Sequence, residues 1–209
     1  MRVIAGALRG RSLVAPKGHG TRPTSDRVRE ALFNVLGDVS GAVVLDLYAG
    51  TGALGIEALS RGAARAVFVE NARPALAPLR RNLETLGLNA SSTVVASPVL
   101  RAVRGLSSQG PFDLVLVDPP YADLAEAAIA LELAAAGGLC ADDARVVLEH
   151  ASRDPAPAVK AFVWQATRRY GDTSLSFYLV GAARPDDASA ADDLHEGVRE
   201  DVSSGGADG

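Results

Sequence analysis

The feature that most constrains the fold is a short stretch in which an apolar run leads through an acid into a glycine-rich turn. Residues 43–47 are apolar except for Asp46, and Gly50, Gly52 and Gly55 follow. A strand that feeds such a loop and then a helix is typical of proteins that wrap the loop around a nucleotide-like ligand. Glycine is needed where a side chain would block the ligand or where φ must be positive. The spacing also fits a dinucleotide fingerprint, so the loop alone does not identify the ligand.

From residue 42 onward, strand-like and helix-like segments alternate. The strand-like runs are nearly all apolar, as expected for a parallel sheet covered on both faces. The alternation predicts an α/β fold with a doubly wound, mostly parallel, seven-stranded Rossmann-like sheet. Two late segments separated only by a Gly-Asp turn predict an antiparallel hairpin at one edge. The expected strands are 43–47, 66–70, 92–96, 113–117, 144–149, 162–170 and 174–180, and the expected helices are 53–61, 72–86, 98–106 and 123–135.

The N-terminal region is basic. Residues 2–6 and 11–15 resemble two short strands, so residues 1–20 are predicted to form a β-hairpin extension. Residues 1–30 contain seven basic and two acidic side chains. That charge suits a polyanionic partner, although a solvated charged surface explains it about equally well. The helix that follows is expected to bury one apolar stripe, made of Val28, Ala31, Leu32, Val35 and Leu36.

The C-terminal region has the opposite charge. Residues 184–209 contain eight acids, two arginines and no apolar periodicity, which predicts an acidic disordered tail after a single domain over 21–183. No apolar run approaches the roughly 20 residues of a membrane span. The short apolar start is not typical of a signal peptide, so a cytoplasmic protein is expected. The three histidines are scattered without metal-ligand spacing, and no metal site is predicted.

Asp46 distinguishes the glycine loop from a typical dinucleotide site. In dinucleotide-binding proteins the first glycine usually follows the strand directly, because the pyrophosphate sits on the helix N-terminus. A carboxylate at the strand end would repel a pyrophosphate but suits an ammonium group. This favours an amino-acid-bearing nucleoside such as S-adenosylmethionine over NAD. Glu70 ends the second strand, about 20 residues beyond Gly50, and can accept the ribose hydroxyl protons of either cofactor.

A second motif, Asp118-Pro119-Pro120-Tyr121, directly follows the strand 113–117. Ligands of open parallel sheets bind beyond the carboxyl ends of the strands, so this motif and the glycine loop share one edge. The prolines stiffen the turn and remove two N–H donors, which leaves the Asp118 oxygens and a backbone carbonyl as acceptors. Such a site suits the exocyclic amine of a flat base on which Tyr121 stacks. The alternative is a proline-rich turn with a packed tyrosine.

Together these motifs resemble those of class I S-adenosylmethionine-dependent amino-methyltransferases. More narrowly, the stretches 2–6 with 9–11, 22–30, 46–62 and 170–173 resemble the bacterial 16S rRNA (guanine-N2)-methyltransferase family, and the resemblance spans about 1–181. It implies an S-adenosylmethionine cofactor, 16S rRNA within the small subunit or its assembly intermediate as partner, and a monomeric enzyme. The residues implied are Asp46, Tyr48, Ala49, Gly50, Thr51, Gly52, Glu70 and Asn71 for the cofactor, Asp118, Pro119, Pro120 and Tyr121 for the target guanine, and Arg9, Arg11, Arg22, Arg27 and Arg29 for RNA phosphates.

The identity of residue 118 favours guanine as the target. Guanine presents N1–H and N2–H side by side, and an ionised aspartate is an acceptor only, whereas an asparagine would suit adenine or cytosine better. We expect direct in-line transfer, with positioning supplying most of the rate. A DNA or protein-glutamine amino-methyltransferase remains an alternative. An NAD-dependent oxidoreductase is disfavoured by Asp46, and a non-catalytic RNA-binding module leaves the motif at 118–121 without a purpose.

Overall fold

A computed structural model of the protein describes residues 1–15 and 26–181. Several sequence-based predictions fall outside these residues. They are the domain boundaries at 20/21 and 183/184, the acidic tail, and the proposed phosphate contact of Arg22. The described residues include the glycine loop and the motif at 118–121.

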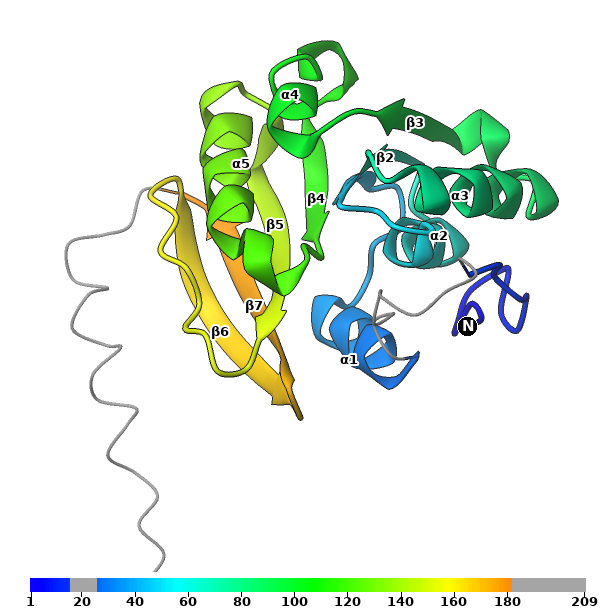
Figure 1. The fold of residues 1–209 in the computed structure, drawn as a ribbon, viewed down its shortest axis with the longest axis horizontal. Coiled ribbons are helices and arrows are strands. Elements are labelled where there is room, and N and C mark those ends of the chain that lie inside the picture. Colours follow the sequence, from blue (N-terminus) through cyan, green and yellow to red (C-terminus); the bar gives the residue numbers. More distant parts are fainter. Residues whose placement is uncertain (16–25, 182–209) are drawn as a thin grey trace, which may run out of the picture.

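The centre of the protein is a seven-stranded sheet (Figure 1). Its strands are β1 (Val43–Leu47), β2 (Arg65–Glu70), β3 (Ser92–Ala96), β4 (Phe112–Val117), β5 (Cys140–Ala151), β6 (Phe162–Tyr170) and β7 (Thr173–Val180). Their order across the sheet is β3-β2-β1-β4-β5-β7-β6, and β7 runs opposite to the other six strands. The predicted doubly wound sheet with an antiparallel edge hairpin is therefore confirmed. Because the strand order reverses between β1 and β4, the fold offers a ligand site at their carboxyl ends.

Helices cover both faces of the sheet (Figure 1). One face packs against α1 (Asp26–Leu36), α2 (Ala53–Ser60) and α3 (Arg73–Thr85), and the other against α4 (Val99–Val103) and α5 (Leu124–Ala136). Successive strand residues point to opposite faces, so Val44 joins the first core and Leu45 the second. No helix in the described part of the chain is long and apolar enough to cross a membrane.

Helix α1 buries Val28, Leu32 and Leu36 as predicted, but its buried face extends to Arg29 and Phe33 rather than to Val35. Val35 was expected in the core but is 46% exposed, whereas Arg29 and Phe33 are buried. Arg29 and Phe33 are four residues apart and so lie on one side of the helix. Periodicity alone did not show whether the buried face widens toward this side or toward Val35. Phe33 fills the core, while Arg29 forms ion pairs with Asp26 and with Glu57 of α2.

The prediction of two N-terminal strands was wrong. Instead of strands at 2–6 and 11–15, the segment forms successive turns closed by one isolated antiparallel bridge between Arg2 and Ser12. A regular hairpin ladder does not form, because several backbone N–H groups of this segment bond to α2 rather than across the hairpin.

Residues 1–15, which we call the N-terminal segment, dock directly onto α2. The Glu57 carboxylate accepts hydrogen bonds from the backbone N–H groups of Ile4 (2.8 Å) and Ala5 (3.0 Å). The approach is close at Gly6, where an added Cβ would lie 1.8 Å from the carbonyl oxygen of Ser60. The N-terminal segment is thus packed against the domain rather than projecting from it.

Candidate active site

Strands on both sides of β1 bring acids to one level at the carboxyl edge of the sheet. In the strand register, Leu47 pairs with both Val69 and Val117, and Val117 pairs with Leu148. The residues one step further along β2, β4 and β5 are Glu70, Asp118 and Glu149. Asp46 lies just below them on β1. Because residues two apart on a strand share a face, these acids all lie on the face that α1, α2 and α3 cover.

Asp46 is the most deeply buried acid of this group, with 1% of its surface exposed. Its Oδ2 accepts a hydrogen bond from the backbone N–H of Gly55 (2.9 Å), while Oδ1 has no hydrogen-bond partner among the described residues. Burial raises the pKa of Asp46 to about 8; the Gly55 N–H opposes this shift, and the nearby charges of Asp118 and Glu70 add to it. Without a ligand, the Asp46 carboxyl is therefore largely neutral at pH 7, and a cation beside it would favour its ionised form.

This burial predicts that the free protein loses stability as the pH rises from about 4 to about 8. The unfolded chain releases the Asp46 proton near pH 3.9, whereas the folded chain holds it until about pH 8. The contribution is therefore fully present below the unfolded pKa and is lost as the pH rises through the folded one, with a slope of roughly 1 kcal/mol per pH unit. Urea unfolding at pH 6.0 and 7.5 measures it. Asp46→Asn should remove this part of the slope, and an unchanged slope would contradict the assignment.

Glu70 joins the glycine loop to the start of α3. Its Oε2 accepts the backbone N–H of Gly50 (2.7 Å), and its Oε1 accepts those of Asn71 (2.8 Å) and Ala72 (2.6 Å). An ionised carboxylate offers about four acceptor sites, so one remains for a ligand hydroxyl while all three bonds persist. The carboxylate thus fixes the backbone of the loop that the sequence singles out.

The three glycines of the loop serve different purposes. Gly50 has a positive φ of 56°, and an added Cβ there would meet no atom within 4 Å. A Cβ on Gly52 would lie 2.5 Å from a Leu79 methyl carbon, and one on Gly55 would lie 2.4 Å from the Phe68 ring. Gly52 and Gly55 therefore permit tight packing of the loop and α2, and the open space lies beside Gly50.

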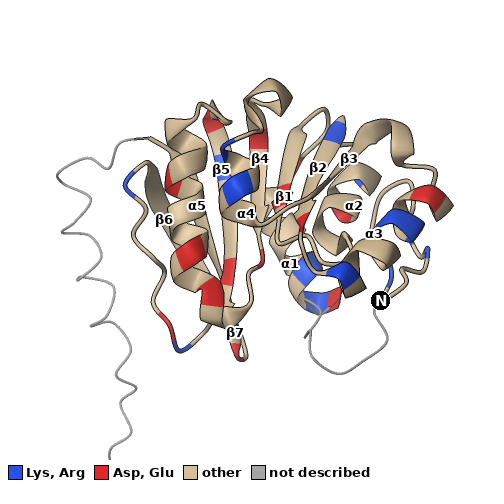
Figure 2. Ribbon diagram, turned by 45° about the horizontal axis from the view of Figure 1, so that its top comes forward, with Lys and Arg blue, Asp and Glu red and all other residues tan. Residues whose placement is uncertain are grey.

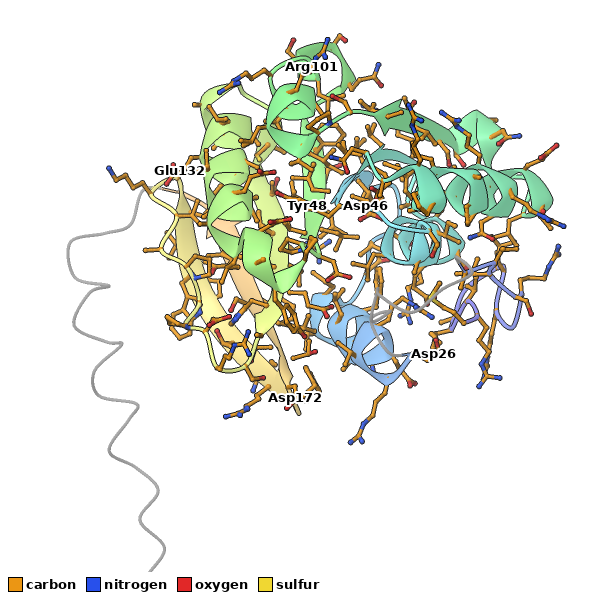
Figure 3. All side chains as sticks on the ribbon, in the orientation of Figure 1. Asp26, Asp46, Tyr48, Arg101, Glu132 and Asp172 are labelled. Carbon is orange, nitrogen blue, oxygen red and sulfur yellow. The ribbon has the colours of Figure 1, made fainter. Side chains whose placement is uncertain are left out.

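Tyr48 contributes its backbone rather than its ring to the loop. It is the one non-glycine residue with a positive φ (61°) in the described part of the chain. Its hydroxyl donates to Glu126 of α5 (3.2 Å), which directs the side chain away from α2. Figure 3 shows Tyr48 and Asp46 at the centre of the molecule, between α5 and α2. Ala49 and Thr51 are buried on either side of Gly50.

Asn82 of α3 was not identified as a functional residue from the sequence. Its side chain is 2% exposed and donates to the carbonyl oxygens of Thr51 (3.0 Å) and Val14 (3.1 Å). It also accepts the backbone N–H of Val14 (2.8 Å). The one available signal was an amide in the otherwise apolar stripe of α3. Through Asn82, the N-terminal segment and the glycine loop are held by the same side chain.

The second motif continues β4 beyond its last strand residue. The Asp118 backbone N–H donates to the carbonyl oxygen of Leu47 (3.3 Å), which extends the pairing with β1 by one residue. Asp118 is half-buried, Pro119 is buried, and Tyr121 begins a short 3-10 helix, η3 (Tyr121–Asp123). The structure therefore places the motif and the glycine loop on adjacent strands, as the sequence predicted.

The basic side chains proposed for RNA divide into two groups. Arg9, Arg11 and Arg27 are exposed, and Figure 2 shows basic residues gathered around α1, α3 and the N-terminal segment. Arg29 is fully buried, and its guanidinium donates to Asp26 (2.9 Å) and to the carbonyl oxygen of Arg2. The prediction that Arg29 contacts a phosphate was wrong, because its guanidinium is buried and paired with groups inside the fold.

Comparison with known proteins shows which protein family this chain is similar to. The family model described as Conserved hypothetical protein 95 matches residues 1–179. Ribosomal RNA small subunit methyltransferase D of Escherichia coli (strain K12) is 42% identical over 164 residues, which are 77% of this chain and 80% of that protein. YlbH of Bacillus subtilis (strain 168), which carries the name of an rRNA methyltransferase, is 37% identical over 181 residues, 85% of this chain and 98% of that protein.

Solved structures that resemble this fold include proteins described as methyltransferases. The Escherichia coli protein yhhF, described as a methyltransferase, is 37% identical and aligns with a TM-score of 0.74 over 88% of this chain and 99% of that one. An RNA methyltransferase from Salinibacter ruber, solved with S-adenosyl-L-homocysteine, shares the fold with a TM-score of 0.60 at 17% identity, over 79% of this chain and 97% of that one. The family-model match spans residues 1–179, from the N-terminal segment into β7, and so covers the positions of both motifs. The chain therefore belongs to the small-subunit rRNA methyltransferase D family of class I methyltransferases.

Proposed function

We propose that the protein transfers the methyl group of S-adenosylmethionine to the exocyclic N2 amine of a guanine in 16S rRNA. The observation that carries this proposal is the placement of Asp118 and the glycine loop on adjacent strands at the switch point of the sheet. A donor held by the loop and a base held by Asp118 would meet there. The family relatives named for small-subunit rRNA methylation support the substrate class.

The residues present fit S-adenosylmethionine. The Oδ1 atom of Asp46 is buried without a partner in the described chain, and a ligand ammonium group would supply its missing donor. Glu70 retains acceptor capacity for a ribose hydroxyl, and the space beside Gly50 admits a ligand close to the backbone. We infer that Asp46, Glu70 and the backbone of 48–52 hold the cofactor. Asn71, which directly follows Glu70, is proposed to join these cofactor contacts. At Ser97 we expect the backbone to contact the adenine.

The choice of guanine rests on the acceptor character of Asp118. An ionised carboxylate accepts the adjacent N1–H and N2–H donors of guanine, whereas adenine offers an acceptor at N1. Pro119 and Pro120 have no N–H groups, so no competing donor is added at these positions. Tyr121 provides a ring on which the base stacks, and base–aromatic stacking is worth roughly 1–3 kcal/mol.

The chemistry requires little acid or base strength from the protein. When bound, the cofactor supplies a sulfonium methyl group. With the cofactor held by Asp46 and Glu70, guanine N2 would attack this methyl carbon in line, the S–C bond would break as the N–C bond forms, and one N–H proton would pass to water. Asp118 orients the amine and Tyr121 holds the ring, so alignment provides most of the rate, and good alignment can be worth about 7–11 kcal/mol. Taking the base out of its stack costs a few kcal/mol.

The direct test is methyl transfer from labelled S-adenosylmethionine to small ribosomal subunits, free 16S rRNA and duplex DNA. The RNA substrates should come from cells that lack this modification. We expect label in N2-methylguanosine after digestion to nucleosides. Label in N6-methyladenosine, or in DNA alone, would refute the proposal. Comparing intact subunits with free rRNA identifies which form is the substrate.

We also propose that the exposed arginines of the N-terminal segment contact RNA phosphates. The double variant Arg9→Gln/Arg11→Gln should bind RNA more weakly at low salt. Its plot of log affinity against log salt concentration should be shallower by about 0.7 to 0.9 for each phosphate that the variant no longer neutralises. Arg104→Gln, an exposed arginine at the end of α4 on the opposite face of the sheet, is the matched control. Equal salt slopes in all three proteins would exclude phosphate contacts by Arg9 and Arg11.

A further inference from the structure

The turn between β6 and β7, with the sequence Tyr170-Gly171-Asp172-Thr173, has no role in the function described so far. Because β7 is antiparallel, its first residue lies at the edge where the parallel strands end, and Thr173 pairs there with Ala151, the last residue of β5. Figure 1 shows this hairpin reaching beyond the end of β4, and Figure 3 places Asp172 at its tip. The turn therefore borders the proposed base site.

One side-chain contact joins this turn to the motif at 118–121. The hydroxyl groups of Tyr121 and Thr173 are hydrogen-bonded at 3.0 Å, although the two residues are 52 positions apart in the chain. Thr173 is 5% exposed. Strands β4 and β7 are separated by β5, so the Tyr121 side chain reaches across the end of β5 to meet its partner.

The anchor at Thr173 is rigid. Its backbone pairs with Ala151 on one side and Tyr170 on the other. The neighbouring backbone is tied down as well, because the Asp172 carbonyl oxygen accepts the N–H of Ser152 (2.9 Å). A β-branched side chain such as threonine also has few χ1 rotamers available. The hydroxyl that meets Tyr121 is therefore held in one place.

From this geometry we propose that Thr173 is a positioning residue, which holds the Tyr121 ring at the place where it stacks on the target base. The inference rests on the proposed function and extends it by assigning the β6–β7 turn to the base site. A tyrosine ring turns about two side-chain torsions. The bond to Thr173 holds the hydroxyl oxygen in place and so restrains χ1, which sets where the ring lies, whereas χ2 turns the ring about the axis through that oxygen. Without this bond, the ring would take up its place only when the base binds. The side-chain freedom lost at that moment would raise the free-energy barrier to methyl transfer.

The test compares Thr173→Val, which removes the hydroxyl and keeps the shape, with Thr173→Ser, which keeps the hydroxyl. Loss of one neutral hydrogen bond should lower kcat/KM for rRNA methylation by about 3- to 10-fold in Thr173→Val. Thr173→Ser should stay within about 2-fold of the parent, and the Kd for S-adenosylmethionine should be unchanged in both. Equal activity of Thr173→Val and the parent would overturn the proposal, and so would equal impairment of the two variants.

A double-mutant cycle separates positioning from a general loss of packing. Tyr121→Phe removes the other hydroxyl, so it should resemble Thr173→Val, and the double variant should be no worse than either single one. Multiplicative losses would overturn the assignment. A readout independent of activity is the ¹⁹F NMR signal of 3-fluorotyrosine at position 121, which should shift in Thr173→Val but not in Thr173→Ser. A parent protein that fails to methylate rRNA would refute the proposed function alone, whereas the NMR comparison still decides the role of Thr173.

Discussion

Replacing Asp118 by asparagine is expected to lower kcat/KM for rRNA methylation by about 100-fold or more. The substitution preserves shape but presents an N–H₂ group to the two N–H donors of guanine. It therefore loses a charge-assisted hydrogen bond, worth roughly 1.5–3 kcal/mol, and misaligns the attacking amine. The measurement is the initial rate of methyl transfer to small subunits over a range of RNA concentrations.

Two further measurements make the Asp118 prediction specific. The Kd for S-adenosylmethionine should change by less than about 3-fold, because in the proposed site Asp118 would contact the base rather than the cofactor. A tenfold change in Kd would correspond to about 1.4 kcal/mol. The pKa of Asp46 should fall toward its ordinary value, because the Asp118 charge contributes to raising it. If Asp118→Asn methylated guanine as fast as the parent, the role of residue 118 in base recognition would have to be abandoned.

The largest effect on stability is expected at Glu57, away from the candidate active site. Its carboxylate is fully buried and lies 3.7 Å from the Arg29 guanidinium and 2.8 Å from that of Arg61. Among the described residues, Glu57→Ala leaves the buried Arg29 charge with Asp26 as its remaining carboxylate, and it removes the acceptor of two backbone N–H groups. Removing one partner of a buried ion pair typically costs about 3–5 kcal/mol, and urea unfolding would measure this loss.

Hydrogen exchange would localise the effect of Glu57→Ala. The amides of Ile4 and Ala5 should exchange faster, because they lose their acceptor. The matched control is Glu30→Gln on α1, where the side chain is exposed and a change within about 0.5 kcal/mol is expected. If the free energy of unfolding of Glu57→Ala fell by less than about 1 kcal/mol, the buried Arg29 charge would have to be stabilised by groups other than Glu57.

Most of the sheet could be predicted from the sequence because its strands are short apolar runs bounded by turn residues. The exception is β5, which was expected at 144–149 but extends over 140–151. Its early part contains Asp142 and Asp143, which interrupt the apolar pattern, and its pairing with β4 shifts register between Phe112 and Leu114. Polar residues in a strand and register irregularities leave little periodicity to detect.

The site was partly predictable for a similar reason. The glycine loop and Asp118 each follow an apolar strand, so a parallel sheet places them together without further information. Thr173 could not be predicted, because its contact with Tyr121 depends on how β7 pairs with β5. Arg29 was misassigned because helical spacing does not reveal which of two overlapping faces is buried. Contacts between segments that are far apart in the sequence depend on the register in which strands pair. Local patterns of apolar and polar residues do not reveal that register.

The docking of the N-terminal segment has a consequence for synthesis of the chain. Its acceptors on Glu57 and Asn82 lie 52 to 68 residues further along the sequence. At about 5–20 residues per second, roughly 3 to 14 seconds pass between translation of the segment and that of its partners. The N-terminal segment can therefore dock on α2 and α3 only after those helices have been made.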